Sequence, residues 1–210
     1  SKRLKASHKD TANIISFYVN DLLTSADERF RICDEGELKF AQSKLLEPQV
    51  GNLILKLAQF NERSVRIVVM AGFAVLLRKL TGRKRIHFAE IRSSEGESLR
   101  ILPIAFSVEG QITFKELLLS TREWYEKADG KGAVLLDQLV EAMQMAQPGE
   151  IFQAFFDPLH EASMERQILR IPIPLQVGSE ISGGHVRLHV SYNRSLRVGA
   201  NELLSYLENV

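Results

Sequence analysis

The longest apolar stretch of the chain runs from Val65 to Leu80, within the sequence SVRIVVMAGFAVLLRKLTG, and only three basic residues interrupt it. A helix that is apolar around its whole circumference is normally buried on more than one face. Ser64 is expected to be its N-cap, and Gly82 is expected to supply the left-handed residue after its end. The stretch is too short and too charged at its ends to span a bilayer. It therefore predicts the central core helix of the protein.

Before this helix, the apolar pattern predicts two further helices. The first spans Thr11–Leu23 and has a rough apolar face. The second spans Glu47–Phe60, has a more regular apolar face and carries Pro48 in its first turn. In the second of these, apolar residues follow the i, i+3, i+4, i+7 spacing of an inward face, namely Val50, Leu53, Ile54 and Leu57. Between the two helices, alternation predicts a hairpin of two short strands, Glu28–Cys33 and Glu37–Ser43.

After the core helix, a strand ending at Ile91 and a strand over Leu99–Val108 are expected on either side of a polar loop, RSSEGES. Pro103 indicates an edge or a bulge in the second strand, because proline cannot donate to a ladder. Thr113 and Glu116 form a T-x-x-E capping box that opens a helix reaching about Lys127. The loop DGKG, residues 129–132, is expected to end this helix, and another helix is expected over residues 133–145.

The last third of the chain is rich in strand patterns. Strands are predicted over Ile151–Asp157, over Ile168–Leu175 as an edge with two prolines, and over His185–Asn193, followed by a helix at Ala200–Leu207. In the third strand Val186, Leu188, Val190 and Tyr192 should face one way and His185, Arg187, His189 and Ser191 the other. The mixture of elements predicts an α/β fold with a mixed β-sheet covered by helices. We expect residues 1–10 to be a flexible lead-in and residues 11–210 to form a single lobe.

Composition narrows the possible functions only slightly. The 210 residues carry a net charge of +1 and one cysteine, Cys33. A net charge this close to zero gives no indication of binding to nucleic acid or to a membrane. One cysteine cannot form a disulfide framework or a cysteine-based zinc site. The first residues are polar and basic, without the apolar region of a secretory signal. A cytoplasmic location, with no nucleic-acid or membrane partner and no metal, is therefore expected.

Two groups of residues are candidates for a site. His185 and His189 share a face of their strand, and such a pair can do acid–base work; the same pattern also describes a half-exposed strand with polar residues outward. Arg83, Lys84 and Arg85 form a basic turn that could receive an acidic partner, or that is simply solvated. The motifs HExxH, GxSxG and GxGxxG and the P-loop motif are absent.

Several segments, in order, resemble the C-terminal lobe of nonribosomal peptide synthetase condensation domains, of the chloramphenicol acetyltransferase-like superfamily. SVRIVVMAGFAVLLRKLTGRKRIHFAEI is similar to the first helix and strand of that lobe. ILPIAFSVEGQITFKELLLSTREWYEKAD resembles its N-T-L-P-L-R…G-x-x-T-F-x-E-L-L segment, PGEIFQAFFD its P-L-F-Q-V-x-F strand, and HVRLHVSYNRSL its closing Y-N-x-x-L-F segment. The resemblance covers the chain from about Tyr18 to Val210 and implies one chloramphenicol acetyltransferase-like lobe.

The departures from the family pattern bear on activity. The family forms amides or esters between groups held on carrier proteins, with a histidine in an HHxxxDG motif of the N-terminal lobe, and this sequence contains neither that motif nor that lobe. Its His-Gln-Asp-x-Pro-Phe-Glu segment should fall near residues 128–137, where only Asp129 remains. No catalytic residue is carried over from the family. The resemblance implies no directly bound cofactor, but phosphopantetheine on a partner carrier protein.

Three interpretations are left open by the sequence. The first is a non-catalytic docking or structural module of a peptide or polyketide synthase, which would contact an acyl or peptidyl carrier protein or a neighbouring domain. The second is half of an acyltransferase, completed by another lobe or subunit, with His185 or His189 as the candidate base. The third is an unrelated interaction domain. We also expect the lobe either to self-associate, most simply as a two-fold homodimer, or to need a neighbouring domain. The first candidate surface is Leu99–Val108, because that segment has almost no charge.

Overall fold

A computed structural model describes residues 2–23, 40–95, 98–108, 110, 112–145, 151–152, 154–158, 175–192, 201–203 and 205. Along the chain, its elements alternate between helices and strands. They are α1 (Lys2–Leu23), β1 (Phe40–Leu45), α2 (Pro48–Leu57), α3 (Glu62–Thr81), β2 (Arg85–Glu95), β3 (Ser98–Ser107), α4 (Phe114–Lys131), β4 (Val134–Leu135), α5 (Leu136–Ala142), β5 (Ala154–Asp157), β6 (Leu175–Ser182) and β7 (His185–Tyr192). Residues 201–203 and 205 are also helical.

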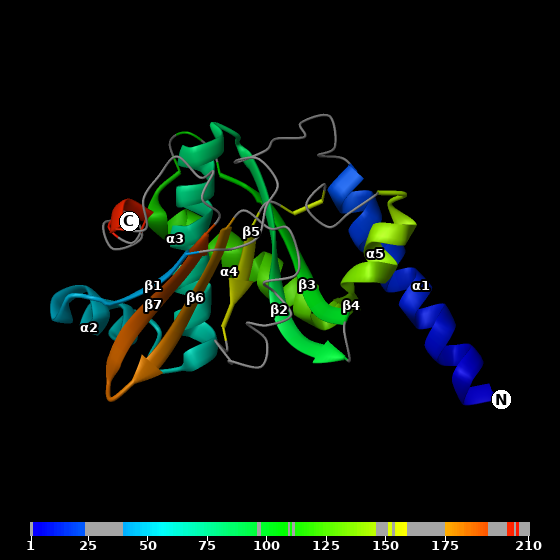
Figure 1. Cartoon of the computed structure of the whole chain (residues 1–210), viewed down its shortest axis with the longest axis horizontal. Helices are drawn as coiled ribbons and strands as arrows, with labels where there is room; N and C mark the ends of the chain where they lie inside the picture. The colour runs from blue at the N-terminus through cyan, green and yellow to red at the C-terminus, as the bar shows by residue number, and fades with distance from the viewer. Residues whose placement is uncertain are drawn as a thin grey trace.

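Within the described residues the strands form one seven-stranded sheet in the order β1-β7-β6-β5-β2-β3-β4. β5 runs parallel to β2 and β6, and the other neighbours are antiparallel. Helices α3 and α4 contact each other. Helix α3 also contacts β2 and β6, and helix α4 contacts β3. Figure 1 shows these two helices against the sheet, with α1 and α5 beside β3 and β4. The predicted mixed sheet covered by helices is confirmed.

The predicted core helix is α3, and it is buried as its pattern indicates. Met70, Phe73 and Ala74 have no exposed surface, and the Phe73 ring meets that of Phe88 on β2 edge-on at 5.1 Å. Gly82 follows the helix in the left-handed conformation, with φ 70°, as predicted. The predicted N-cap is wrong: the helix starts earlier, because the Asn61 side-chain oxygen accepts a hydrogen bond from the amide of Ser64.

The first helix is longer than its apolar pattern, since α1 begins at Lys2 and so includes the segment expected to be a flexible lead-in. Its C-terminal half is anchored by Tyr18, which is 1% exposed. The Tyr18 hydroxyl lies 3.0 Å from the carbonyl oxygen of Ala128 and 2.9 Å from that of Gly132, so that its one proton is shared between them. A single side chain of α1 therefore satisfies carbonyls at the C-terminal end of α4.

The face that helix α2 presents to the core is rotated from the predicted one, since Val50 and Ile54 are half-buried against the core but Leu53 and Leu57 are not. Gly51 and Leu55 are buried on the helix, followed by Ala58 after its end, whereas Leu53 and Leu57 are exposed. The reason is that Leu46 and β7 lie next to Gly51, where a small residue lets the helix approach the strand closely. The i, i+3, i+4, i+7 spacing therefore placed Val50 and Ile54 correctly but Leu53 and Leu57 wrongly, because close packing at Gly51 turns the helix toward Leu55.

The polar loop expected after Ile91 is instead part of a β-hairpin, because β2 continues to Glu95 and β3 starts at Ser98. Pro103 pairs with Ala89 of β2, while β4 pairs with β3 only at Arg100 and Ile101. Among the described residues no strand pairs with the other side of Pro103, which fits the predicted edge or bulge. The apolar segment expected to form a dimer surface is buried within the chain, notably Leu99, Ile101, Leu102, Ile104, Ala105 and Val108, so that expectation about the surface is wrong.

Helix α4 begins with the predicted capping box, since the Thr113 side chain accepts from the Glu116 amide and Glu116 accepts from the Thr113 amide. Its predicted end is wrong. The helix continues through Asp129 and Gly130 to Lys131 and ends at Gly132, which has φ 97°. β4 and the short α5 then replace the single helix expected over residues 133–145.

The predicted alternation of β7 is confirmed for its apolar side, where Val186, Leu188 and Val190 are buried. On the other side His185 is exposed, but His189 is only 8% exposed. β5 starts at Ala154, three residues later than predicted. The strand expected over residues 28–33, the turn after it and residues 168–174 lie outside the described residues, as does most of the final helix. None of the described helices is long and apolar enough to cross a membrane.

Candidate functional site

A buried carboxylate lies where β2 meets the C-terminal part of α4. Glu90 is in the middle of β2, on the face that also carries Phe88 and faces the helices, and it has no exposed surface. Oε1 of Glu90 lies 3.5 Å from the hydroxyl of Tyr125, a residue of α4 that is itself buried. The Nε atom of Arg92 lies 2.9 Å from Oε2 of Glu90. An acidic side chain in such a place is almost always paired.

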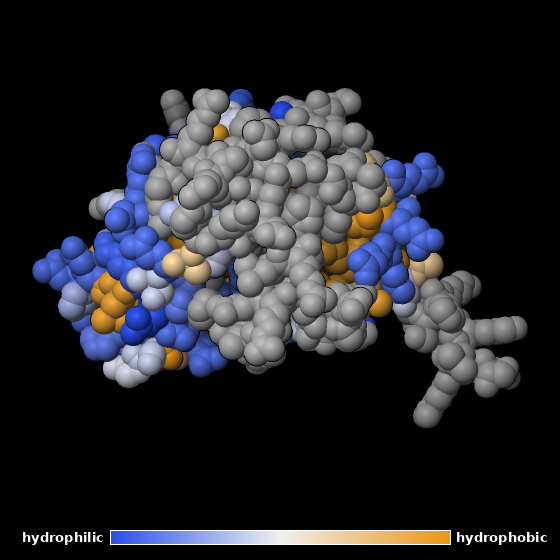
Figure 2. Space-filling model, in the orientation of Figure 1, coloured by the Kyte–Doolittle hydropathy of each residue, from blue (hydrophilic) through white to orange (hydrophobic). Residues whose placement is uncertain are grey.

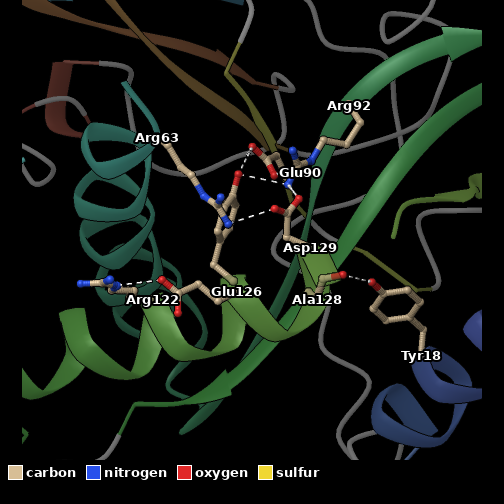
Figure 3. Close-up of polar contacts among 9 residues, drawn as sticks. Tyr18, Arg63, Glu90, Arg92, Arg122, Glu126, Ala128 and Asp129 are labelled. Atoms are coloured by element: carbon tan, nitrogen blue, oxygen red, sulfur yellow. Dashed lines mark hydrogen bonds and ion pairs between the residues drawn. The ribbon is translucent and has the colours of Figure 1, made fainter. Parts of the chain in front are cut away.

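Asp129 extends this pair into a network that joins three elements. Its Oδ1 accepts a hydrogen bond from Nη2 of Arg92 on β2, and its Oδ2 accepts one from Nη2 of Arg63 at the start of α3, both at 2.9 Å. Arg92 also donates to the Tyr125 hydroxyl, at 3.0 Å. Figure 3 shows both arginines directed at the Asp129 carboxylate. We call Glu90, Arg92, Tyr125, Asp129 and Arg63 the Glu90 cluster.

Burial dominates the electrostatics of the cluster. It raises the pKa of Glu90 to about 7, although the neighbouring cations Arg92 and Arg66 act in the opposite direction. Burial, together with the nearby Glu90 carboxylate, also raises the pKa of Tyr125. The two arginine guanidinium groups lie over the Tyr125 ring, at 5.2 Å for Arg63 and 5.3 Å for Arg92. The cluster therefore holds a carboxyl group that changes its charge near neutral pH.

Chemically, the cluster can take up or release a proton, and it can hold two cations around one aspartate. The Arg92 and Asp129 side chains are 25% and 36% exposed, so its outer part meets solvent. The Glu90 carboxylate itself is enclosed, and a substrate would have to displace Arg92 to reach it. The arrangement is therefore best suited to fixing β2, α3 and α4 relative to one another.

Beside the cluster, a groove of about 570 Å³ lies between α3, α4 and the end of α2. Its lining is apolar at the bottom and charged at the margin. Ile67, Val68 and Leu118 are among its apolar residues, and Arg63, Arg122 and Glu126 are its charged ones. Arg122 donates through Nε to Glu126 at 2.9 Å. Arg63 connects the groove to the Glu90 cluster, so the two features are continuous.

The two histidines considered as candidate bases lie on the sheet, on the face opposite to Glu90. His185 is exposed and pairs with Ser182 at the turn between β6 and β7, whereas His189 pairs with Gly178 in the middle of the ladder. Four residues of a strand span about 13 Å, so the two imidazoles do not meet on one small group. Nε2 of His189 lies 3.7 Å from Oε1 of Glu180, which is also 3.1 Å from Nε of Arg187.

The basic turn between α3 and β2 is held by backbone hydrogen bonds. The Lys84 carbonyl accepts from the Val108 amide at 2.7 Å, and the Arg83 amide donates to Oγ1 of Thr81 at 3.2 Å. Lys84 is exposed, while Arg83 and Arg85 are half-buried. The turn thus presents positive charge on a fixed backbone, and a role in docking stays a prediction.

Sequence reasoning missed the Glu90 cluster, although one signal was present. Glu90 is an acidic residue at an inward position of an otherwise apolar strand, RIHFAEI, with Arg92 two residues later on the same face. Asp129 was noted only as the remnant of a family segment. Within the described ranges, no three His, Cys, Asp or Glu side chains converge in a way that could hold a metal ion.

Comparison with known proteins finds this fold in condensation domains. No family model and no curated protein matches the sequence. Among solved structures, the starter condensation domain of rhizomide synthetase RzmA superposes with a TM-score of 0.72 at 11% identity, covering 99% of this chain and 54% of that one. The first condensation domain of the CDA synthetase gives a TM-score of 0.70 at 14% identity, covering 97% and 52%.

A third solved structure, the SgcC5 protein from Streptomyces globisporus, gives a TM-score of 0.68 at 18% identity, covering 99% of this chain and 57% of that one. The chain therefore spans about half the length of these solved structures. At such low identities the likeness establishes the fold: the chain has the architecture of a single lobe of a condensation domain. The resemblance predicted from the sequence motifs is confirmed at that level.

Proposed function

We propose that this chain is a non-catalytic, condensation-domain-like lobe that serves as a docking or structural module in a nonribosomal peptide or polyketide synthase. The observation that carries the proposal is the superposition of nearly the whole chain on about half of each condensation domain. A lobe with this fold offers surfaces that other domains of a synthase can contact.

The positions of the remaining candidate bases support this proposal. General acid–base catalysis needs a group of suitable pKa within reach of the reacting atoms. His189 is 8% exposed and lies beside Glu180, and His185 lies at a hairpin end. A transfer reaction at either histidine would require a second surface that no described part of this chain provides.

The basic turn is the proposed contact for a carrier protein or a neighbouring acidic domain. Positive charge accelerates encounters with an acidic surface, and the gain falls as salt screens it. Arg83, Lys84 and Arg85 provide three such charges between α3 and β2. The cofactor in this proposal is phosphopantetheine, attached to the carrier protein rather than to this chain.

The docking proposal is tested with the phosphopantetheine-loaded carrier domain encoded nearest to this chain. We expect Lys84→Glu, and more strongly the reversal of all three charges, to weaken its binding at low ionic strength and much less in about 0.5 M salt. Lys115→Glu, at an exposed position on α4, is the matched control. Equal binding by parent and triple variant at low salt would exclude this turn as the docking site.

The absence of catalysis is tested by incubating the purified chain with an acyl-loaded carrier and an amine acceptor and searching for the amide by mass spectrometry. We expect no product above a control without protein. Product formation would instead favour half of an acyltransferase, completed by a second lobe or subunit.

One observation favours that second candidate function: Glu90 is a buried carboxyl group with a pKa raised to about 7, which is a property of many catalytic acids and bases. If the chain is active, Glu90→Gln and His189→Gln separate the candidate bases. Loss of turnover in only one variant, with binding of the loaded carrier unchanged, identifies the group that transfers the proton.

A further inference from the structure

Helix α2 exposes two leucines on its outer side, beside the exposed polar residues Gln49, Asn52 and Lys56. Gly51 and Leu55, with Ala58 just beyond the helix, form the buried side. Leu53 and Leu57 are 58% and 55% exposed, and they follow one another at a spacing of i, i+4 on the outside. Neighbouring exposed apolar side chains of this kind are typical of a contact surface. The outer face of α2 is uncovered in the isolated chain.

The large apolar side chains with the greatest exposure among the described residues lie on or next to α2 and on α4. All five large ones are at or near α2 and the groove between α3 and α4, namely Leu45, Leu53, Leu57, Phe60 and Leu119. Leu57 and Leu119 both line the groove. Figure 2 shows apolar side chains at the surface on the left of the view, where Figure 1 places α2. We call Leu53, Leu57, Phe60, Leu119 and the groove the α2 patch.

The backbone beyond α2 is arranged so that it exposes an aromatic ring. Gln59 and Phe60 have φ values of 51° and 57°, a left-handed conformation that is unfavourable for residues other than glycine. The conformation leaves Phe60 70% exposed, next to Gln59 and Asn61, which line the groove. Strain of this kind is concentrated at binding sites. The patch therefore combines a projecting ring with a neighbouring groove.

The charges around the groove balance one another. Arg122 and Glu126 are one turn apart on α4, with side chains that are 65% and 52% exposed. Arg63, at the same margin, is matched by Asp129. A strongly acidic or basic partner would meet repulsion from half of these groups. A second copy of the same surface, related by a two-fold axis that passes between Arg122 and Glu126, would place Arg122 of each copy opposite Glu126 of the other.

From these features we infer that two copies of this chain associate through the α2 patch in a two-fold dimer. A two-fold interface needs a surface that complements itself, and here the projecting Phe60 and Leu57, the groove and the balanced charges all lie together. In the dimer, Arg122 of one copy meets Glu126 of the partner, while the apolar side chains of each copy enter the groove of the other. This assigns self-association to a surface different from the strand expected from the sequence.

Sedimentation velocity over a wide range of protein concentration tests the inference. We expect the parent chain to pass from monomer to dimer. Leu57→Gln and Leu119→Gln should each weaken association about tenfold or more, because each removes apolar area from the interface. Leu45→Gln is the matched control, since Leu45 is similarly exposed, at 43%, but does not line the groove. Circular dichroism checks that every variant is folded.

A charge exchange identifies the partner as a second copy. Arg122→Glu leaves two neighbouring carboxylates at this position and Glu126→Arg leaves two neighbouring guanidinium groups, so each variant alone should remain monomeric. An equimolar mixture of the two should associate, because the acidic patch then meets the basic one. Failure of the mixture to associate, a parent that stays monomeric at high micromolar concentration, or a dimer lost with Leu45→Gln alone would each overturn the inference.

The inference does not depend on the proposed docking function. The experiments use only this chain, whereas the docking test uses a carrier domain and the basic turn at residues 83–85. A monomeric parent that still binds the carrier would refute the dimer alone, and a dimer that binds no carrier would refute the docking role alone.

Discussion

The Nε atom of Arg92 lies 2.9 Å from Oε2 of Glu90, and yet neither atom makes an aligned hydrogen bond. The two groups attract each other by charge, but the directional part of the interaction is missing. The other nitrogen that Arg92 uses, Nη2, is well placed on Asp129 and Tyr125. The stabilisation that the charged Glu90 carboxylate receives from its neighbours is therefore smaller than the free energy lost when burial removes its water. For this reason the pKa of Glu90 is raised.

This relationship predicts how stability depends on pH. In the folded protein the pKa of Glu90 is about 7, against an ordinary value of 4.5, so between these values the folded state binds more protons than the unfolded state. Stability should consequently fall as pH rises through this window, by an amount on the order of 3 kcal/mol. Chemical denaturation at a series of pH values measures the slope.

Glu90→Gln tests the assignment of that slope. The substitution keeps the shape of the side chain but removes its charge, so the decline between pH 4.5 and pH 7 should disappear and the variant should be at least as stable as the parent at pH 8. Glu141→Gln, at an exposed position on α5, is the control and should leave the slope in place. A slope that persists in Glu90→Gln would show that another group titrates.

Asp129→Ala should reduce the free energy of unfolding by about 1–2 kcal/mol, because it removes the acceptor that Arg92 and Arg63 share. Most of the loss should come from the partly buried Arg92, since exposed pairs such as the one with Arg63 contribute about 0–1 kcal/mol. Double-mutant cycles with each arginine measure the two couplings. Glu126→Ala, which breaks an exposed pair on α4, should have an effect below about 0.5 kcal/mol at low protein concentration.

Gly178→Ala should destabilise the sheet strongly. A Cβ atom at Gly178 would overlap the carbonyl oxygen of Asp157 on the adjacent strand, so that β5 and β6 would have to move apart at the centre of the sheet. We expect a loss of about 3 kcal/mol or more in urea denaturation. Gly130→Ala is the matched control: the added methyl meets nothing within 4 Å in α4, and it should stabilise the protein by about 0.5–1 kcal/mol.

Ala74→Asp tests the core position of α3. Ala74 has no exposed surface and lies next to Phe73, which packs on the sheet, so an unpaired carboxylate there would be strongly destabilising. Ala12→Asp, at an exposed position of α1, is the control: it makes the same change in helix propensity and charge without burying the carboxylate, so it should destabilise the protein much less. Melting temperatures within a degree or two of each other for the parent and Ala74→Asp would refute this placement of the helix.

Where sequence reasoning succeeded, the signal was local. The capping box at Thr113 and Glu116 and the left-handed Gly82 depend on contacts between residues a few positions apart, and the apolar alternation of β7 is a period of two along one short segment. Where it failed, a distant residue decided the outcome. The turn signal of residues 129–132 was overridden because Tyr18 and the two arginines of the Glu90 cluster hold the last turn of α4 in helical form.

The same contrast between local signals and distant contacts applies to the candidate site. The acidic residue in β2 is visible in the sequence, but its partners lie 35 and 39 positions further on, at Tyr125 and Asp129, and the sequence carries no sign of that proximity. The two histidines that do stand out in the sequence are separated along β7, because even spacing on a strand places residues on one face without bringing them together.

The sequence by itself determined the α/β class, the buried α3, the capping box and the resemblance to a condensation-domain lobe, because apolar periodicity and capping act over a few residues. Only the tertiary structure decided which face of α2 is buried, that Leu99–Val108 is covered by the chain itself, and that Glu90 lies beside Arg92 and Tyr125, with Asp129 joined to them through Arg92. Burial and the pKa values that follow from it depend on which distant segments pack together, and that is a property of the whole fold rather than of any one stretch of it.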